Sequence, residues 1–487
     1  MTAIITEKFR AHNADQFFES FTEASGNTYY LMIGKATAFS SGTSGGTDDS
    51  PPTPADDISS EFYTWDSSIA AKKIASSNIT YAIPRRDWAN GTIYDMYEDN
   101  ISSSNATTSG ATNIFDSTFF FRTSDNRVYK VLDNNSGTAY SGAEPTSEST
   151  STFVLGGYTL KYMYAITASE QASYLTTDFM PVSTDSTVSS AAVDGSISSI
   201  IVTNTGSGLT NGTYYAAVYG DGTSAGTSSG AIIKISVASN VISAVSTGNT
   251  GIQQAGAGYT FGTVNLGSGF TFSDTSLSSA SAIGGSGAAI SVVISPKGGH
   301  GSNAVTELGG HYVLLQSTLE GADNDDFLTA NDFRNINLVI DPTTFGTSTV
   351  GTATTFRTTY AMKFSGSPGT FTADETITQT NSDSFVATGK VIEYDATLKI
   401  LYYQQERFGG YGALSSTGGQ YAFSGTGTVT GGTSSATGTP DSSADSAVSL
   451  SGGNTITFTD GFANPELQPD SGNIIYRENR KPISRAT

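Results

Sequence analysis

The sequence has 487 residues, which is too long for one ordinary hydrophobic core, so several domains are expected. Its formal net charge is −21, from 44 acidic and 23 basic residues, which argues against binding to nucleic-acid phosphates or to an anionic membrane surface. The absence of cysteine excludes disulfides and thiolate chemistry.

The composition favours strands and turns over helices. Only 37% of the residues are hydrophobic and 14% are charged, whereas aromatic residues reach 11% and glycine is abundant. Few aliphatic residues combined with many aromatic residues, Thr and Gly are typical of sheets. We therefore predict a mainly β protein, β-sandwich-like and multi-domain, with a few short helices.

The chain shows no export or membrane signal. The first residues, Met1–Phe9, lack a charged region followed by an apolar one, so no signal peptide is expected. No apolar run reaches the length of about 18 residues that a membrane-spanning helix requires. Folding in a cytoplasm is the corresponding expectation.

The N-terminal third is predicted to alternate short helices with strands. Asn13, followed by Gln16, resembles a capping box and predicts a helix with Phe17, Phe18 and Phe21 on its apolar side. A buried strand is expected at Thr28–Gly34, a loop over 40–57 and a compact helix at Ser67–Ala75. Further strands are expected at Phe119–Phe121, Arg127–Leu132 and Gly157–Ile166.

From about residue 190 the sequence changes to short β-runs separated by Gly, Ser and Thr. Ile197–Thr203 and Val241–Val245 both lead into Gly-rich turns, and Ser229–Ile235 is similar to Ser286–Val292. This pattern indicates an inserted β-domain at 190–295 with an imperfect internal repeat. Chance similarity in a biased composition is the competing explanation.

The remaining chain contains a second light segment between two denser ones. Strands are expected in it at Phe371–Thr378, Lys390–Asp395 and Leu398–Tyr403. We predict a second inserted β-domain at 349–455. The denser stretches, 1–189, 296–348 and 456–487, would then form one discontinuous core, as is usual when domains are inserted.

No catalytic, cofactor or metal motif stands out. Gly-x-Ser-x-Gly occurs at 42–46, 222–226 and 226–230, but none of these follows a clear strand and opens a helix, as a nucleophile elbow requires. The histidines, His12, His300 and His311, form no zinc motif.

Two loops leave alternatives open. Pro296–Asn303 resembles a phosphate loop but lacks the Gly-Lys-Ser/Thr ending, which favours a tight glycine turn. Glu320–Asp326 offers oxygen ligands for calcium, but it lacks the central Gly and final Glu of a helix-loop-helix site. A helix cap or a solvated loop is the alternative there.

Two densely specified segments stand out from this background, Ile83–Trp88 and Ile474–Ile483. The first contains Arg85, Arg86, Asp87 and Trp88, a set that suits bidentate ion pairing and a large buried anchor. We expect Trp88 to be packed and Arg85 or Arg86 to pair with a carboxylate. Both an ion pair within the chain and a contact between subunits remain open for this set.

The second segment is expected to act similarly through its polar residues. The suspected structural or interface residues there are Tyr476, Glu478, Asn479 and Arg480. Arg477, Arg480, Lys481 and Arg485 also concentrate positive charge at this end of an acidic chain. The charge could bind an acidic partner surface or belong to a solvated tail.

Both segments resemble the baseplate wedge subunit of T-even-like contractile-tail bacteriophages. Ile83–Trp88 is similar to the family's N-terminal signature and Tyr476–Ile483 to its C-terminal one. The resemblance extends over the denser stretches, including Tyr162–Val182 and Pro296–Val339. The inserts have no counterpart in the T-even protein and resemble β-modules of tail proteins from marine cyanobacterial phages.

The resemblance implies a structural protein of the virion tail baseplate, not an enzyme, assembled in the host cytoplasm. It implies a homodimer that binds other baseplate wedge proteins and holds them together during assembly and tail contraction. No cofactor, nucleic acid or membrane is implied. The alternatives are a receptor-binding or adhesin-like β-protein with glycan-binding inserts, and a secreted glycan-active enzyme, which the missing export signal disfavours.

Overall fold

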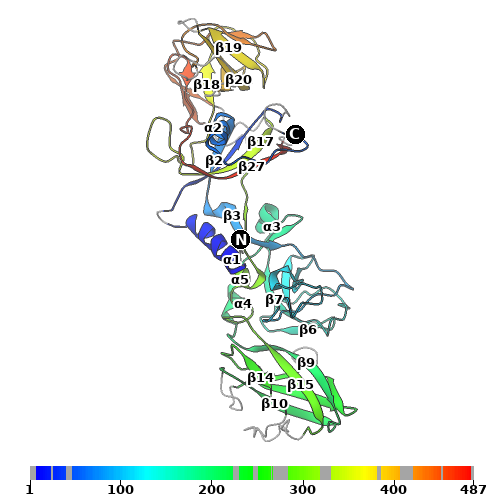
Figure 1. Cartoon of the computed structure of the whole chain (residues 1–487). Helices are drawn as coiled ribbons and strands as arrows, with labels where there is room; N and C mark the ends of the chain where they lie inside the picture. Colours follow the sequence, from blue (N-terminus) through cyan, green and yellow to red (C-terminus); the bar gives the residue numbers. More distant parts are fainter. Residues whose placement is uncertain are drawn as a thin grey trace. The chain divides into compact units, whose positions relative to one another are not determined.

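The computed structural model describes residues 7–23, 26–39, 46–222, 230–244, 251–264, 266, 283–318, 331–380, 385–405, 421–450 and 453–483. The chain forms two compact units, Met1–Phe18 with Ile79–Gln316 and Glu19–Asn78 with Ser317–Thr487. Each unit consists mainly of antiparallel sheets with short helices (Figure 1). The prediction of a mainly β, multi-domain protein is confirmed.

In the first unit, two small sheets share an apolar core. Their strand orders are β16–β3–β8 and β4–β5–β7–β6. The strands are β3 (Ile79–Pro84), β4 (Phe120–Arg122), β5 (Arg127–Asp133), β6 (Phe153–Leu155), β7 (Tyr158–Ala165), β8 (Phe179–Pro181) and β16 (Tyr312–Leu315). β7 is buried along nearly its whole length because Leu160 and Met163 contribute to different apolar clusters.

The helices of this unit are short and mostly capped by side chains. They are α1 (Glu7–Ser20), η2 (Ile114–Asp116), α3 (Ala168–Tyr174), α4 (Ser186–Ser190) and α5 (Ala304–Leu308). Thr167 and Glu170 form a capping box at α3, and Asn303 caps α5. α1 begins at Glu7, so the prediction that Asn13 caps this helix is wrong. Asn13 lies inside it, and the partly buried Phe18 stacks on Tyr81 with ring centroids 4.3 Å apart.

The described residues between 197 and 294 form their own β-structure around a separate apolar core (green in Figure 1). β9 pairs with β15, and a second sheet has the order β12–β11–β10–β14 with β13 beside β11. The strands are β9 (Ile197–Ser207), β10 (Gly212–Gly220), β11 (Ile232–Ala238), β12 (Val241–Ala244), β13 (Ile252–Gln254), β14 (Gly262–Val264) and β15 (Ser286–Ile294). Tyr259 lies in this core, where its hydroxyl accepts a hydrogen bond from the Ala231 N–H at 3.1 Å.

The second unit contains a four-stranded sheet, a seven-stranded sheet and a hairpin. Their strand orders are β2–β1–β17–β27, β23–β22–β19–β20–β21–β18–β26 and β24–β25. The first sheet consists of β1 (Tyr29–Gly34), β2 (Ser68–Ile74), β17 (Phe333–Ile340) and β27 (Asn473–Ile483). The others consist of β18 (Tyr360–Lys363), β19 (Thr376–Thr380), β20 (Val386–Asp395), β21 (Ile400–Gln404), β22 (Val429–Gly431), β23 (Thr437–Gly438), β24 (Ala447–Ser449), β25 (Thr455–Thr457) and β26 (Phe462–Ala463).

The helix predicted at Ser67–Ala75 is wrong, because this segment is strand β2. Its side chains Ile69 and Ala70 are fully buried, and the strand pairs antiparallel with β1. The helix lies just before it as α2 (Ile58–Asp66), where Asp57 accepts a hydrogen bond from the Ser60 N–H at 2.8 Å. A short 3-10 turn, η1 (Ser76–Asn78), follows the strand.

The expected discontinuous core is distributed over both units. Its strands β1, β2, β17 and β27 form one sheet in the second unit, whereas β3 to β8 lie in the first. The three predicted domain ranges, 1–189 with 296–348 and 456–487, 190–295, and 349–455, stay a prediction. The described residues of 190–295 do contain their own sheets and core.

Candidate functional site

The segment Ile83–Trp88 leaves strand β3 and is fixed by main-chain hydrogen bonds on both sides. Arg85 N–H donates to Asp178 O at 2.8 Å. Arg122 N–H donates to Arg86 O at 2.7 Å, and Trp88 N–H donates to Arg122 O at 2.8 Å. Arg122 at the end of β4 thus holds the segment in a parallel bridge.

Asp87 accepts hydrogen bonds from two arginines of the same chain. Arg85 Nη2 lies 2.8 Å from Asp87 Oδ2, and Arg122 Nη2 lies 2.6 Å from Asp87 Oδ1. Burial opposes ionisation of Asp87, but the hydrogen bonds from the two guanidinium groups hold the pKa of its carboxyl below the usual value. The carboxylate is therefore charged at neutral pH and completes an Arg-Asp-Arg cluster.

Arg86 and Trp88 are packed rather than ion-paired. The Arg86 guanidinium lies 4.3 Å from the centroid of the Phe120 ring and donates to Phe115 O at 3.0 Å. Its burial lowers its pKa to about 10. Trp88 is half-buried, with its ring edge-on to Tyr140 at 5.8 Å between centroids. The structure thus pairs Arg85 within the chain and packs Trp88, while a role in subunit contact stays a prediction.

The suspected residues of the C-terminal segment lie on β27, in the other unit. Asn479 accepts from Asn335 Nδ2 and donates to Pro52 O, each at 2.8 Å, which ties β27 to its neighbour and to the loop before α2. Tyr476 donates to Glu478 at 2.9 Å, and Glu478 pairs with Arg480 at 3.0 Å. These residues do not come together with Arg85 to Trp88 in one site of the described structure.

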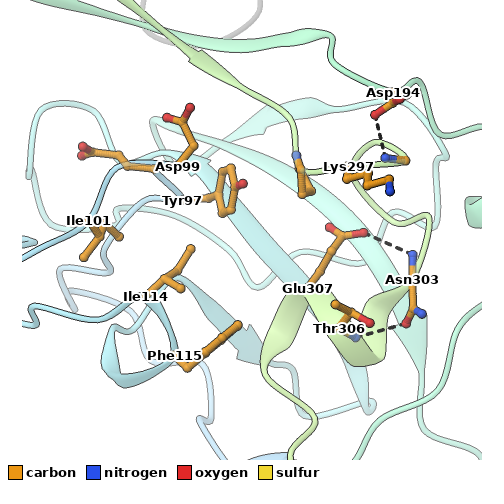
Figure 2. A pocket seen from close by; sticks show the side chains of 13 residues that line it. Tyr97, Asp99, Ile101, Ile114, Phe115, Asp194, Lys297, Asn303, Thr306 and Glu307 are labelled. Carbon is orange, nitrogen blue, oxygen red and sulfur yellow. Dashed lines mark hydrogen bonds between the residues drawn. The ribbon is translucent and has the colours of Figure 1, made fainter. Parts of the chain in front are cut away.

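The first unit contains a cavity that the sequence did not reveal. Its volume is about 600 Å³, and it is lined by acidic, aromatic and loop residues that include Tyr97, Asp99, Phe115, Asp194, Lys297 and Glu307 (Figure 2). One wall is the glycine-rich loop 296–303. From the sequence we predicted a glycine turn for this loop. No sequence pattern indicated that residues near 97 and 115 line the same cavity.

The hydrogen bonds of this loop support a glycine turn rather than a phosphate loop. Gly298 N–H donates to Asp194 Oδ1 at 2.7 Å, and Gly301 N–H donates to Glu307 Oε1 at 2.7 Å. Figure 2 shows the Glu307 carboxyl turned toward the Asn303 nitrogen. Gly299 adopts φ +95°, and an added Cβ would lie 2.5 Å from the Val193 nitrogen, so this position requires glycine. Because carboxylates occupy these N–H groups, they are not free to bind a phosphate.

Glu307, which lines the cavity, also belongs to a buried cluster with Lys130 and His300. Lys130 Nζ lies 2.9 Å from Glu307 Oε2 and 3.9 Å from the Tyr97 ring centroid. His300 Nδ1 lies 3.8 Å from Glu307 Oε2, and neither ring nitrogen has a hydrogen-bond partner among the described residues. Lys130 and Glu307 are 177 positions apart, so no local spacing could have pointed to this cluster.

The pKa values of all three side chains in this cluster are lower than usual. Burial lowers the pKa of Lys130, against the attraction of Glu307. Burial alone would raise the pKa of Glu307, but Lys130 and His300 lower it to about 2. Burial, followed by the charge of Lys130, lowers the pKa of His300 to about 4. At neutral pH the cluster is therefore an ion pair beside a neutral imidazole, and Glu307 is occupied in holding the loop and the lysine.

The described residues show no other arrangement of side chains suited to chemistry. Within them, no group of three or more His, Asp or Glu side chains could hold a metal ion. His12 is exposed on α1, and His311 contacts the rings of Phe115 and Tyr312, so the three histidines stay apart. The possible calcium stretch Glu320–Asp326 lies outside the described residues, and the Gly-x-Ser-x-Gly matches run into undescribed stretches. No helix in the described part is both long and apolar enough to cross a membrane.

The fold and these clusters are those of a β-rich protein of several domains. Its buried charged side chains bind its own backbone and core. Within that class, residues 3–139 match the family model Phage-Gp8, described as Bacteriophage T4, Gp8. This is a structural family of baseplate wedge proteins. The match supports the resemblance to the T-even baseplate wedge subunit over 137 of the 487 residues.

The match includes the first of the two dense segments, Ile83–Trp88, together with β1 to β5. The second segment, Ile474–Ile483, lies outside it, so its role as a family signature stays a prediction. No curated protein matches the chain.

Proposed function

We propose that the protein is a structural subunit of a baseplate wedge in a contractile phage tail. In this role it binds neighbouring wedge proteins and holds them together during assembly and tail contraction. The observation that carries the proposal is the Gp8 family match over residues 3–139. We propose the tail baseplate of the virion as its location, which the same match supports.

The way the structure uses its charges supports this role. Lys130 and Glu307 neutralise each other inside the first unit, and Glu375 in the second accepts hydrogen bonds from the N–H groups of Thr372 and Ser434. Buried carboxylates that are paired in this way favour one rigid arrangement, which a structural subunit needs. We propose that the protein is not an enzyme, needs no cofactor and binds neither nucleic acid nor membrane.

We propose further that it acts as a homodimer assembled in the host cytoplasm. Asp87 and Arg85 keep part of their side chains at the surface beside an otherwise satisfied cluster. A partner carboxylate or guanidinium could join that cluster at little cost, because the charges are already fixed in position. The Arg85–Asp87 cluster is therefore our proposed contact residue set in the first unit.

Antibody labelling of intact phage particles tests the wedge role. Antibodies raised against the purified chain should label the far end of the tail, seen by electron microscopy of particles with extended and with contracted tails. Particles lacking tails are the control. Label on the head, or on free fibres only, would contradict the wedge role.

Light scattering during size-exclusion chromatography tests the dimer. A dimer has about twice the chain mass of 50.5 kDa, and an Asp87→Arg variant should shift it toward monomer if the proposed contact is right. A dimer that Asp87→Arg leaves unchanged would remove this contact from the proposal. A trimer that binds sugars on a glycan array would instead favour the receptor-binding alternative.

A further inference from the structure

The four-stranded sheet of the second unit has one covered edge and one open edge. At the β2 edge, Ala71 N–H donates to Phe356 O at 2.8 Å, and Ala70 forms a bridge with Arg357. At the other edge, β27 pairs with β17 on one side only. Among the described residues no backbone group pairs with its outer side, and the loop before α2 contacts β27 only through the side chains of Arg477, Asn479 and Lys481. β27 is therefore the strand of this sheet that offers unpaired N–H and C=O groups.

β27 is long and only partly protected for an open edge. It runs for 11 residues, whereas strands typically have about five or six. Natural edges are blunted by charge, proline or short length, and here the charged residues and Pro482 begin only at Arg477, near the middle of the strand. Earlier in the strand, Ile475 and Tyr476 are 46% and 52% exposed. An exposed apolar pair on an open edge is typical of a strand that receives another one.

The charge of β27 is opposite to that of the whole chain. The strand contains Arg477, Arg480 and Lys481 against a single acid, Glu478, in a protein of net charge −21. Arg477 pairs with Asp56 at 3.2 Å and is nearly buried, and Arg480 pairs with Glu478 of the same strand at 3.0 Å. The Arg480 and Lys481 side chains are nevertheless 54% and 69% exposed, and Lys481 lies 3.7 Å from Asp49 Oδ1. Positive charge at this edge therefore remains available to an incoming acidic segment.

We propose that the outer edge of β27, from Asn473 to Lys481, binds an extended acidic segment of another protein as an additional strand. Main-chain hydrogen bonds supply the affinity of such an interaction, and side chains on the edge supply its selectivity. Ile475 and Tyr476 contact the apolar side chains of the added strand, and Arg480 and Lys481 pair with its carboxylates. This inference deepens the proposed wedge role and rests on it for the neighbouring protein that supplies the strand.

A second copy of this chain fits the edge poorly. Two β27 strands side by side would bring two sets of Arg and Lys together, and like charges on paired strands are destabilising. An acidic strand from a different protein relieves the same charges. The proposed homodimer would then use another surface, which leaves β27 free for a neighbour.

Hydrogen exchange of the full-length chain, read by mass spectrometry over residues 473–481, tests the proposal. The probe is a synthetic ten-residue peptide of alternating Glu and Val. One control peptide has Lys in place of each Glu, and a second keeps the Glu residues but has Pro in place of alternate Val residues, so that it cannot form a ladder. The acidic peptide should slow exchange in β27 and the controls should not.

Charge reversal in the protein provides the matched comparison. Arg480→Glu and Lys481→Glu together should weaken binding of the acidic peptide by roughly tenfold or more, because two attractive cross-strand pairs become repulsive. Lys297→Glu, at an exposed position of the first unit, should leave binding unchanged. The peptide experiment on the wild-type chain tests the proposal by itself. A folding defect in the variants would therefore leave its result valid.

Three outcomes would overturn the proposal. The acidic peptide fails to protect β27 at millimolar concentration, or either control peptide protects it equally. Alternatively, β27 is already protected without peptide in a way that increases with protein concentration, which would assign the edge to a second copy. Antibody labelling of particles tests the wedge role separately. Label at the baseplate without peptide binding would overturn the edge proposal alone. Peptide binding with label elsewhere on the particle would overturn the wedge role alone.

Discussion

Glu307 accepts a hydrogen bond from Lys130 at 2.9 Å, and the two side chains are only 4% and 0% exposed. The other oxygen of the same carboxylate accepts from the Gly301 N–H at 2.7 Å. One side chain of α5 thus joins strand β5 to the loop that lines the cavity. The core of the first unit depends on this contact, because either charge alone would be buried without a counterion.

We expect Glu307→Gln to destabilise the first unit by about 3–5 kcal/mol, because it leaves Lys130 buried and unpaired. The chain has two tryptophans, Trp65 in the second unit and Trp88 in the first. Urea unfolding of a Trp65→Phe background, followed by Trp88 fluorescence, therefore reports the first unit. The double variant Lys130→Met with Glu307→Leu should lose less than the sum of the single changes, since it removes both charges. Additive losses would mean that the two side chains do not stabilise each other.

His300 should make the first unit sensitive to mild acid. Burial and the charge of Lys130 lower the pKa of His300 from 6.5 to about 4. As the pH falls from about 6.5 to about 4, His300 is therefore protonated in the unfolded chain but stays neutral in the folded chain. The free energy of unfolding decreases accordingly. The loss reaches roughly 3 kcal/mol at the lower end of that window.

Urea unfolding between pH 7 and pH 4.5, in the same Trp65→Phe background, measures this loss. His300→Asn should flatten the dependence, whereas His12→Asn, at an exposed position, should keep it. Acid sensitivity that survives in His300→Asn would assign the titration to another group. Glu307, with a pKa of about 2, contributes its own loss below about pH 4.5, outside most of this range.

The two arginines that pair with Asp87 should contribute unequally to the stability of the first unit. Arg122 is nearly buried and also donates to Asn126, while Arg85 is more exposed. Arg122→Ala should therefore cost about 2 kcal/mol, and Arg85→Ala roughly 0.5 kcal/mol, because exposed ion pairs contribute little. Thermal unfolding followed by circular dichroism measures both. Equal losses would show that exposure does not decide the strength of these pairs.

The sequence predicted those features that local pattern determines. Strands β5 and β7 were predicted because aromatic and β-branched residues alternate within a few positions. An ion pair of Arg85 or Arg86 with a carboxylate was expected, because these residues lie in one short segment with Asp87. The contribution of Arg122 was not expected, since β4 brings it from elsewhere in the chain. Local pattern thus located the segment but only half of its ion-pair cluster.

The features that sequence reasoning missed depend on tertiary pairing. Ser67–Ala75 contains Ala, Lys and Ile in a run that is compatible with a helix, but pairing with β1 and complete burial of Ile69 decide for a strand. The Lys130–Glu307 pair and the cavity in front of it join distant stretches of the chain. No motif encodes such a pair, because its only requirement is that two opposite charges are buried at the same place.

Glu375 should stabilise the second unit as Glu307 stabilises the first. Its carboxylate, only 3% exposed, accepts hydrogen bonds from the N–H groups of Thr372 at 2.7 Å, Thr433 at 2.9 Å and Ser434 at 2.8 Å. Burial opposes ionisation, yet these donors hold its pKa below the usual 4.5. The stability that this provides is present above about pH 4.5 and is lost as the pH falls below that value.

We expect Glu375→Gln to destabilise the second unit by about 1–3 kcal/mol, because the new amide group turns a donor toward N–H groups that need an acceptor. Ser434→Ala, which removes the hydroxyl and keeps the N–H, should cost about 1 kcal/mol. Urea unfolding in a Trp88→Phe background, followed by Trp65 fluorescence, measures both. The same substitutions in the Trp65→Phe background should leave the Trp88 transition in place if each unit unfolds on its own. A Glu375→Gln variant as stable as the parent would show that solvent replaces the carboxylate at no cost, which its burial argues against.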